Sequence, residues 1–199
     1  MTIKIVDKFE PFKKFDKWFN DAKNDSRIIE PTAMNLATVG ENLLPSNRMV
    51  LLKKHDENGF CFFTNLASKK AQEINKNPHI SLCFYWGAQS RQIRIQGIAK
   101  QIENFEADQY FATRPRESQI GAWASKQSSV MNHRQDFEER IKLYEEKFRN
   151  IEVTRPQFWS GFRVEPDNFE FWHEAEFRLH HREFYQKFSN GWQIDILYP

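Results

Sequence analysis

The sequence predicts a mainly β protein with peripheral helices: an antiparallel barrel of about seven or eight strands, in a single domain spanning 1–199. Segments of strand length that are apolar or alternating follow one another along most of the chain, and Gly, Pro and Asn separate them. The chain contains 19 Phe and 6 Trp, large side chains that suit a β-rich core. We find no internal repeat and no linker long enough to separate two domains.

The N-terminal segment, 1–30, is expected to contribute one amphipathic helix. Phe12, Phe15 and Phe19 recur at helical spacing with Lys and Asp between them, so one face of this helix should pack on the core. Pro31 then prevents the helix from continuing through the polar connector that follows.

The strands are expected where short apolar runs end at turn residues. Residues 80–86 are strongly apolar, which predicts a strand buried on both faces. Residues 91–99 alternate between polar and apolar side chains, which predicts a half-buried antiparallel strand. The C-terminal β segment, 157–199, should complete the sheet and the site. In chain order, the predicted strands are 34–39 (with a turn at 42–47), 48–53, 60–63, 80–86, 91–99, 158–164, 168–172, 178–185 and 192–198.

Three further helices are expected around the barrel. Residues 68–77 open with Ser68, a favoured N-cap residue. Residues 103–113 follow a helical pattern, and residues 133–149 carry one apolar stripe on an otherwise charged helix. Residues 116–129 are rich in Ser, Gln and Gly and are expected to be irregular.

The composition argues against several classes of function. The formal net charge is only +2, so no overall field favours nucleic acid. No apolar run approaches the roughly 18 residues of a membrane-spanning helix, and the N-terminus lacks the apolar stretch of a signal peptide. Cys61 and Cys83 lie in apolar runs outside any C-x-x-C pair, which indicates free thiols in a reducing compartment. A cytoplasmic protein is therefore expected.

A group of cations surrounds the first predicted hairpin. Arg48 and Lys53 flank its first strand, and Lys69 and Lys70 lie in the first turn of the helix that follows. Cations are unusual in a first helical turn, because the free backbone amides there already attract anions. A phosphate bound between these groups would explain the pattern, and a solvated lysine pair on a surface helix is the alternative.

A second polar group follows the predicted helix 103–113. Tyr110, Arg114 and Ser118 lie four residues apart, so they share one side if helical geometry persists that far. Together with Lys53 they would form a second anion pocket. The alternative is an ordinary helix end, where an arginine is favoured in any case.

A third group lies in the predicted strand 178–185. A period of two places Arg178, His180 and Arg182 on one face, where an anion could bind, although a solvated strand face is the alternative. The sequence has no metal-binding motif, since its 6 His are scattered. It also lacks a P-loop, a G-x-G-x-x-G motif and a G-x-S-x-G motif.

Several segments, in order from about residue 31 to the C-terminus, resemble the flavin mononucleotide (FMN)-binding motifs of the pyridoxine/pyridoxamine 5′-phosphate oxidase family. They are Arg48-Met49-Val50-Leu51-Leu52-Lys53, Phe63-Thr64-Asn65, Ser68-Lys69-Lys70-Ala71, Arg91-Gln92-Ile93-Arg94, Tyr110-Phe111, Arg114-Pro115, Ser118-Gln119-Ile120-Gly121-Ala122-Trp123-Ala124-Ser125, Gln127-Ser128, Glu170-Phe171-Trp172 and Arg178-Leu179-His180.

The resemblance implies a homodimer of split β-barrels with FMN at the subunit interface. It also implies an oxidase that converts pyridoxine or pyridoxamine 5′-phosphate to pyridoxal 5′-phosphate, with O₂ as acceptor and hydrogen peroxide as product. The residues implied in FMN binding are Arg48, Met49, Val50, Leu51, Leu52, Lys53, Phe63, Thr64, Lys69, Lys70, Gln92, Gln127, Ser128, Trp172 and Arg182.

Within that set, the resemblance assigns Arg48, Lys69 and Lys70 to the flavin phosphate, with Gln127 and Ser128 assisting. The residues implied in binding the substrate phosphate are Lys53, Tyr110, Arg114 and Ser118. The residues implied at the substrate ring are Arg178, Leu179 and His180, of which Arg178 and His180 are the catalytic pair.

The sequence departs from the family pattern near both groups. Lys69 stands where the family usually has Arg, which keeps the charge but loses the bidentate fork. His173 and Glu174 replace the usual Gln-Gly, and His181 replaces the usual Asp. The resemblance assigns no role to the N-terminal segment and no preference between the two vitamers.

Two other functions stay open at this point. One is a related split-barrel flavin oxidase that acts on another aromatic ring, such as a phenazine precursor. A substrate without phosphate would not need all four residues of the second anion pocket, which counts against it. The other is a non-catalytic protein that binds flavin or pyridoxal phosphate, which the pair Arg178 and His180 disfavours.

Overall fold

The structure, a computed structural model, describes residues 4–189 and 191–199. Within them, ten antiparallel strands form one continuous sheet in the order β1-β10-β9-β8-β7-β6-β2-β3, and β4 and β5 lie off this path. The strands are β1 (Lys4–Asp7), β2 (Ala33–Val39), β3 (Pro45–Leu51), β4 (Lys54–Asp56), β5 (Gly59–Asn65), β6 (His79–Trp86), β7 (Arg91–Gln101), β8 (Trp159–His173), β9 (His181–Phe188) and β10 (Gly191–Ile196).

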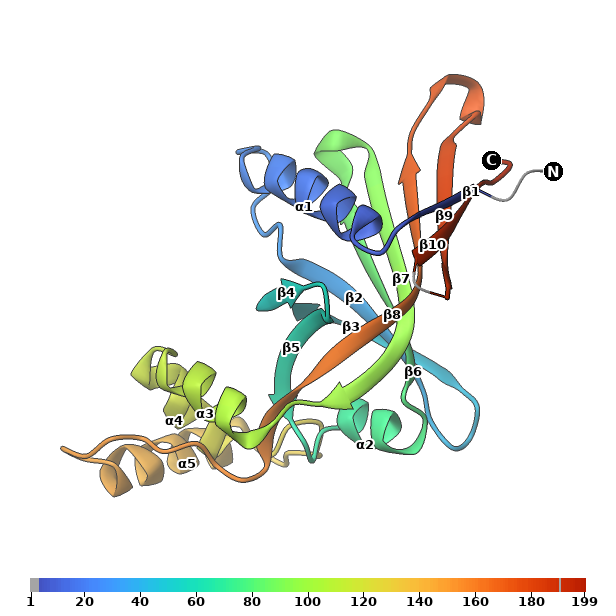
Figure 1. Ribbon diagram of the computed structural model, residues 1–199. Helices are drawn as coiled ribbons and strands as arrows, with labels where there is room; N and C mark the ends of the chain where they lie inside the picture. Colours follow the sequence, from blue (N-terminus) through green and yellow to red (C-terminus); the bar gives the residue numbers. More distant parts are fainter. Residues whose placement is uncertain (1–3, 190) are drawn as a thin grey trace.

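Helices lie around this sheet, in a cluster at one end of it and as a single long helix at the other (Figure 1). None of the helices in the described part of the chain is long and apolar enough to cross a membrane. They are α1 (Glu10–Lys23), α2 (Lys69–Lys76), α3 (Asn104–Ala112), α4 (Arg116–Ala124) and α5 (Arg134–Lys147), with short 3₁₀ turns η1 (Gly87–Gln89) and η2 (Glu176–Arg178).

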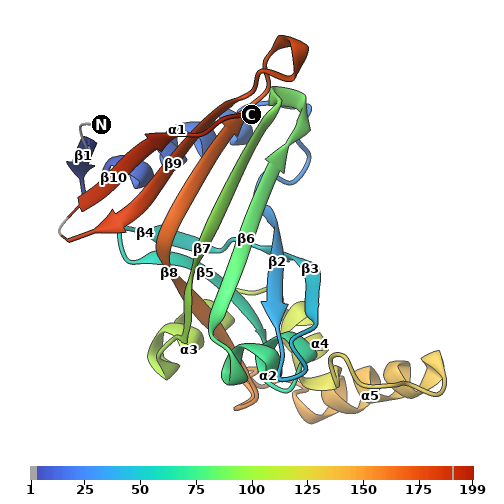
Figure 2. The same ribbon diagram turned by 90° about the vertical axis from the view of Figure 1, so that its right-hand side faces the viewer.

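The sheet divides along its longest strand, β8. The first part of β8 pairs with β5, its last part pairs with β9, and β7 runs along its other edge. Because β4 follows β3 closely in the chain and pairs with β5, the strands β8-β7-β6-β2-β3-β4-β5 close into a barrel. The hairpin β9–β10 extends beyond the barrel (Figure 2), and β1 pairs with β10. A barrel with such a divided sheet is a split barrel.

Strand β8 stays continuous although it contains a proline. Pro166 lies opposite Gly97 of β7, where the register of the two strands shifts. A bulge of this kind tolerates the missing backbone N–H of proline. Gly97 is required there, because a Cβ atom would lie 2.1 Å from the carbonyl oxygen of Glu165. The two predicted strands 158–164 and 168–172 are therefore one strand.

The main core fills the barrel, and α1 belongs to it. Pro11 and Glu10 suit the first turn of α1, where no N–H partner is needed and negative charge is favoured. Phe15 is fully buried, with its ring 4.8 Å from that of Phe60 and 5.3 Å from that of Phe84. Burying a Phe side chain contributes about 1.5–3 kcal/mol. The predicted amphipathic helix is thus confirmed as part of the core.

A second, smaller core holds α3, α4 and α5 at the end of the barrel where β8 begins. Trp159 packs its ring 5.1 Å from that of Phe111 on α3, and Ile120 of α4 and Phe148 after α5 belong to the same cluster. This packing fixes α3 and α4 beside β5 and so positions one side of the site.

The other predicted elements are confirmed within a few residues, with four corrections. The segment 116–129 is not irregular throughout, because it contains α4. The second half of the predicted turn 42–47 is strand, since β3 begins at Pro45. Strand β6 alternates between buried and more exposed residues, so it is not buried on both faces. The predicted strand 178–185 begins only at His181, because the chain forms η2 before it.

Candidate active site

The largest described cavity, about 870 Å³, lies between the start of α2, the end of β5, strand β3 and helix α4. It brings together the first two cationic groups that the sequence singles out. Fourteen of the predicted site residues line it: Arg48, Met49, Val50, Leu51, Lys53, Phe63, Thr64, Lys69, Lys70, Tyr110, Arg114, Ser118, Gln127 and Ser128. Ser46, Asn47, Asn65 and Trp159 also line it.

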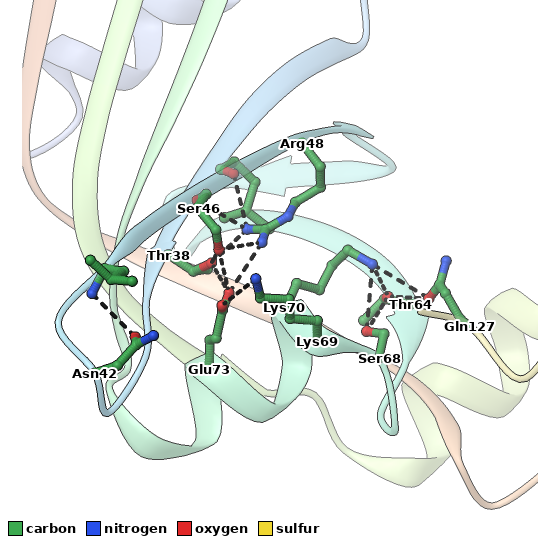
Figure 3. Close-up of polar contacts among 12 residues, drawn as sticks. Thr38, Asn42, Ser46, Arg48, Thr64, Ser68, Lys69, Lys70, Glu73 and Gln127 are labelled. Carbon is green, nitrogen blue, oxygen red and sulfur yellow. Dashed lines mark hydrogen bonds and ion pairs between the residues drawn. The ribbon is translucent and has the colours of Figure 1, made fainter. Parts of the chain in front are cut away.

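Lys70 lies at one end of this cavity with no acidic partner. Its side chain comes from the first turn of α2 and is only 8% exposed. Its ammonium group donates to Thr64 Oγ1 at 3.2 Å, to Gln127 Oε1 at 3.4 Å and to Ser68 Oγ at 3.5 Å (Figure 3). Within the described residues it forms no ion pair with a carboxylate. Burial lowers the pKa of Lys70, and the Arg48 charge lowers it further.

A buried cation among neutral oxygens is costly unless an anion neutralises it. The start of α2 adds the free backbone amides of a helix N-terminus at the same place. Ser68 occupies the N-cap position as predicted, but its side chain makes no capping hydrogen bond, and its hydroxyl lies close to Lys70 instead. Lys70 and this helix start therefore have the chemistry of a phosphate site.

Arg48 reaches the same end of the cavity from β3, and its guanidinium is held by the protein. Nη1 donates to Thr38 Oγ1 at 2.5 Å, and Nη2 donates to Ser46 Oγ at 2.7 Å and to Glu73 Oε2 at 3.1 Å (Figure 3). Lys69 is largely exposed, 3.8 Å from the other oxygen of Glu73. No motif in the sequence pointed to Thr38, Ser46 or Glu73, although Glu73 follows Lys69 by one helical turn.

The second pocket lies on the α3–α4 side of the cavity, around Arg114. The Nη1 atom of Arg114 is buried and has no hydrogen-bond partner within residues 4–189 and 191–199. The guanidinium lies 4.7 Å from the ring centroid of Trp159, and burial lowers its pKa. A buried, unpaired guanidinium nitrogen is rare in proteins and marks a place where an acceptor belongs.

Aromatic rings form the floor beside Arg114. Tyr110 stacks on Phe63 with ring centroids 3.9 Å apart, and Phe63 stacks on Trp159 at 5.3 Å. Burial raises the pKa of the Tyr110 hydroxyl, so it stays protonated and able to donate. Trp159 was not among the predicted site residues, because a large aromatic side chain in a β-rich pattern is expected only in the core.

Tyr110, Arg114 and Ser118 do reach one cavity, although not by the predicted route. Helix α3 ends at Ala112 and α4 begins at Arg116, with Pro115 between them. The two helices are separate, so continuous helical spacing does not align these side chains. Instead, the packing of both helices on Trp159 brings them together with Lys53.

The remaining predicted site residues do not line this cavity. Leu52 is buried and does not line the cavity. Gln92, Trp172 and Arg182 are direct cross-strand neighbours on β7, β8 and β9. Trp172 lies thirteen residues along β8 from Trp159 of the cavity, a rise of roughly 40 Å in extended chain. Figure 2 shows the turn between β8 and β9 at the opposite end of the sheet from α2 and α4.

His180 contacts Trp172 and so belongs with Gln92, Trp172 and Arg182, which we call the Trp172 group. The two rings are 4.7 Å apart, and His180 Nδ1 accepts a hydrogen bond from the backbone N–H of Ala175 at 3.4 Å. Arg182 pairs with the buried Glu170 at 2.9 Å. Burial raises the pKa of Glu170, but its hydrogen bonds to arginines outweigh that effect, so the pKa of Glu170 lies below its ordinary value. Leu179 is exposed beside them.

Strand alternation does not place Arg178 with His180 and Arg182, which corrects the prediction. Arg178 belongs to η2, and both it and Phe177 adopt positive φ angles, of 63° and 57°. Alternation holds only from His181 onward. His181 pairs across the sheet with His173, so the two histidines that depart from the family pattern are neighbours, with rings 6.5 Å apart.

The fold and the cavity define a class of protein: a split β-barrel with two cationic pockets in one cavity. The chain belongs to the pyridoxamine 5′-phosphate oxidase family. Residues 21–147 match the family model described as pyridoxamine 5′-phosphate oxidase, and residues 159–199 match the pyridoxine 5′-phosphate oxidase C-terminal dimerisation region.

Individual relatives agree with this assignment. The chain is 48% identical over 190 residues to a pyridoxine/pyridoxamine 5′-phosphate oxidase of Zymomonas mobilis, covering 96% of this chain and 98% of that one. It is similar to the crystal structure of PhzG from Burkholderia lata 383 in complex with tetrahydrophenazine-1-carboxylic acid, with a TM-score of 0.89 and 28% identity over 95% and 92% of the two chains. A pyridoxamine 5′-phosphate oxidase-related, FMN-binding protein of Nostoc punctiforme shares the fold, with a TM-score of 0.75 and 15% identity over 95% and 98%. The predicted split β-barrel is confirmed.

Proposed function

We propose that this protein is an FMN-dependent oxidase that converts pyridoxine 5′-phosphate or pyridoxamine 5′-phosphate to pyridoxal 5′-phosphate, with O₂ as the electron acceptor and hydrogen peroxide as the product. Relatives such as the Zymomonas mobilis protein carry the name of this activity over nearly the full length of the chain. The observation that carries the proposal is a pair of cations, the buried Lys70 and the half-buried Arg114, which line one cavity and have no carboxylate partner among the described residues.

Two phosphate groups account for the two cations. The flavin phosphate is assigned to Arg48, Lys69 and Lys70, with Gln127 and Ser128 beside them. The fit is favourable, because a phosphate carries a charge of about −1.5 to −2 at neutral pH and brings several strong acceptor oxygens. These acceptors would neutralise the buried ammonium of Lys70, which now donates only to neutral oxygens.

The substrate phosphate is assigned to Lys53, Tyr110, Arg114 and Ser118. Arg114 offers its unpaired Nη1, and the protonated hydroxyl of Tyr110 adds a neutral donor. The walls between the two phosphate positions come from Val50, Leu51, Phe63 and Thr64, which leave room for the flavin ring and ribityl chain.

Oxidation at the substrate ring needs more than these binding groups. The bound flavin supplies the redox chemistry, taking up two electrons from the substrate and delivering them to O₂. Arg178, Leu179 and His180 are assigned to the substrate ring, with Arg178 and His180 nearest the carbon that is oxidised. The hydrogen bond from the Ala175 N–H to Nδ1 leaves Nε2 of a neutral His180 free to donate towards a ligand.

We further propose that the Trp172 group, which includes His180, reaches the cavity from the partner subunit of a homodimer. Gln92, Trp172 and Arg182 lie at the far end of the sheet from the cavity of their own chain. A two-fold axis reverses the direction of the sheet in the partner subunit and can bring these residues to the cavity of the other chain. The match of residues 159–199 to a dimerisation region supports this arrangement. A location in the cytoplasm is part of the proposal, and the free thiols of Cys61 and Cys83 fit a reducing compartment.

Similarity to the PhzG structure keeps a phenazine-type substrate as the second candidate. The ligand of that structure carries a carboxylate instead of a phosphate, and a carboxylate can also accept a hydrogen bond from Arg114 Nη1, so turnover has to separate the two candidates. The purified protein should therefore be incubated with FMN and each candidate substrate, and peroxide and aldehyde formation followed. Turnover of both vitamer phosphates, and none of the dephosphorylated vitamers, is expected.

Arg114→Ala tests the division between the two phosphates. We expect KM for pyridoxine 5′-phosphate to rise about tenfold or more, since a charge-assisted hydrogen bond in a dry pocket contributes about 1.5–3 kcal/mol. FMN content, measured by flavin absorbance, should stay near that of the wild type. Arg134→Ala, which removes an exposed arginine from α5, is the control. Equal loss of FMN and of substrate affinity would show that the two anion sites are wrongly divided.

A further inference from the structure

Glu73 is a carboxylate within a site whose other charges are positive. It lies in the second turn of α2, and its side chain is only 11% exposed. Its Oε2 atom accepts hydrogen bonds from Thr38 Oγ1 at 2.6 Å, from Ser46 Oγ at 2.7 Å and from Arg48 Nη2 at 3.1 Å (Figure 3). Its Oε1 atom lies 3.8 Å from Lys69 Nζ.

The directions of the hydrogen bonds that join Arg48 to Glu73 are fixed. Arginine can only donate and a carboxylate can only accept. Thr38 and Ser46 lie between them, so each hydroxyl donates its hydrogen to Glu73 and accepts from Arg48. Arg48 is therefore joined to Glu73 in three ways: directly, through Thr38 and through Ser46.

The surrounding fold is built to accommodate this carboxylate. Burial raises the pKa of Glu73, but the bonds from Thr38, Ser46 and Arg48 outweigh that effect and leave the pKa below its ordinary value. The group is therefore ionised at neutral pH. Gly40 packs against it, since a Cβ atom there would lie 3.2 Å from Glu73 Cγ.

We propose that Glu73 is a positioning residue for the flavin phosphate, which it serves by holding the Arg48 guanidinium at the cavity wall. The inference rests on the proposed FMN site and adds a residue to it. An arginine side chain is long and loses rotamer freedom when it binds an anion. Because the Glu73 network fixes Arg48 beforehand, that loss is smaller when the phosphate enters.

The charge of Glu73 would by itself repel a phosphate, so the two effects oppose each other. Both of its oxygens face protein donors, Oε2 towards Arg48 and the hydroxyls and Oε1 towards Lys69. These partners neutralise the carboxylate locally, and the net charge of Arg48, Lys69, Lys70 and Glu73 remains positive. The ordering of Arg48 therefore outweighs the repulsion.

The test compares FMN with riboflavin, which lacks the phosphate, by quenching of flavin fluorescence in the apoprotein. Glu73→Ala should weaken FMN binding by about tenfold, and riboflavin binding should change less than about twofold. Glu73→Gln, which keeps the shape and one acceptor, should give an intermediate loss. The matched control is Glu41→Gln, which removes an exposed carboxylate that pairs with Lys76 of the same helix.

A double-mutant cycle shows whether Glu73 acts through Arg48. Adding Glu73→Ala to Arg48→Ala should weaken FMN binding no further, since the group to be positioned is already gone. Unchanged or tighter FMN binding by Glu73→Ala would overturn the proposal, as would equal losses for FMN and riboflavin. A wild-type protein that does not prefer FMN to riboflavin would instead refute the proposed phosphate site itself.

Discussion

Lys70 is buried and Arg114 is half-buried with its Nη1 atom enclosed, and within the described residues no carboxylate pairs with either cation. Burial lowers the pKa of both groups, so each is destabilised in the form that an anion needs. A protein gains no stability from such residues. Their presence at the wall of one cavity is explained when each neutralises a bound anion.

The lowered pKa of Lys70 predicts how FMN binding depends on pH. The phosphate favours the protonated ammonium, so affinity should fall as pH rises from neutral towards the ordinary lysine pKa of 10.5, starting below that value. Lys70→Ala should weaken binding by about tenfold or more at neutral pH and should flatten this alkaline decline. Fluorescence titrations at pH 7 to 10 measure both effects, above the roughly pH 6 ionisation of the phosphate itself.

A matched lysine on the same helix serves as the control. Lys76 is 62% exposed and pairs with Glu41 on the surface, so Lys76→Ala should leave both the affinity and its pH dependence unchanged. If Lys70→Ala kept the wild-type decline with pH, another group would have to be responsible for it.

At the scale of elements, regular patterns were predicted well and irregular ones were not. The helical spacing of Phe12, Phe15 and Phe19 and the alternation of β7 come from burial on one face, which the sequence records directly. Helix α4 has no such stripe, because it is held by the small core around Trp159, which forms only in the folded protein. The break before His181 was also missed, since no glycine marks it.

For the candidate site, too, the sequence indicated the residues that form a local pattern and not those that depend on contacts between distant elements. Cations that follow each other within one segment, such as Lys69 and Lys70, are visible in the sequence. Glu73 and Trp159 act through neighbours from other elements, Arg48 on β3 and Arg114 before α4, so no local pattern could indicate them. The separation of the Trp172 group from the cavity depends on the length and direction of β8.

The turn before β9 carries local strain that can be tested. Phe177 has a φ of 57° and is 88% exposed, so its side chain contributes little packing while its backbone is in a region that disfavours Phe. Asn tolerates this region, and Phe177→Asn should raise the free energy of unfolding by up to about 1 kcal/mol. Urea denaturation of both proteins measures the change.

Phe105 provides the comparison, because it is 72% exposed in α3, where the backbone is helical. Phe105→Asn relieves no strain and lowers helix propensity, so it should leave stability unchanged or reduce it slightly. A loss of stability in Phe177→Asn that matched or exceeded the loss in Phe105→Asn would contradict the idea that the turn is strained.

At the scale of the whole molecule, the proposed site residues of one chain form two groups that do not meet. The cavity with Arg114 lies at one end of the barrel, and His180 with Trp172 lies beyond the other end of β8. The sheet face that bears Trp172 also bears the exposed side chains of Met49 and Tyr85, an apolar surface suited to a partner. A two-fold dimer would join each half to the complementary half of its partner.

This arrangement predicts that two inactive variants restore each other. In homodimers of Arg114→Ala or of His180→Ala, every site is defective. In a mixed dimer, one site carries both defects and the other carries none, so isolated mixed dimers should show about half of wild-type activity. The variants are co-expressed with different affinity tags, the mixed dimers are isolated, and peroxide formation is measured.

Arg114→Ala combined with Lys53→Ala is the control, because both residues belong to the same half and each mixed site keeps one defect. No activity in the first pair would mean that each site is built within a single chain, and activity in the control would mean that Arg114 and Lys53 do not belong to the same half.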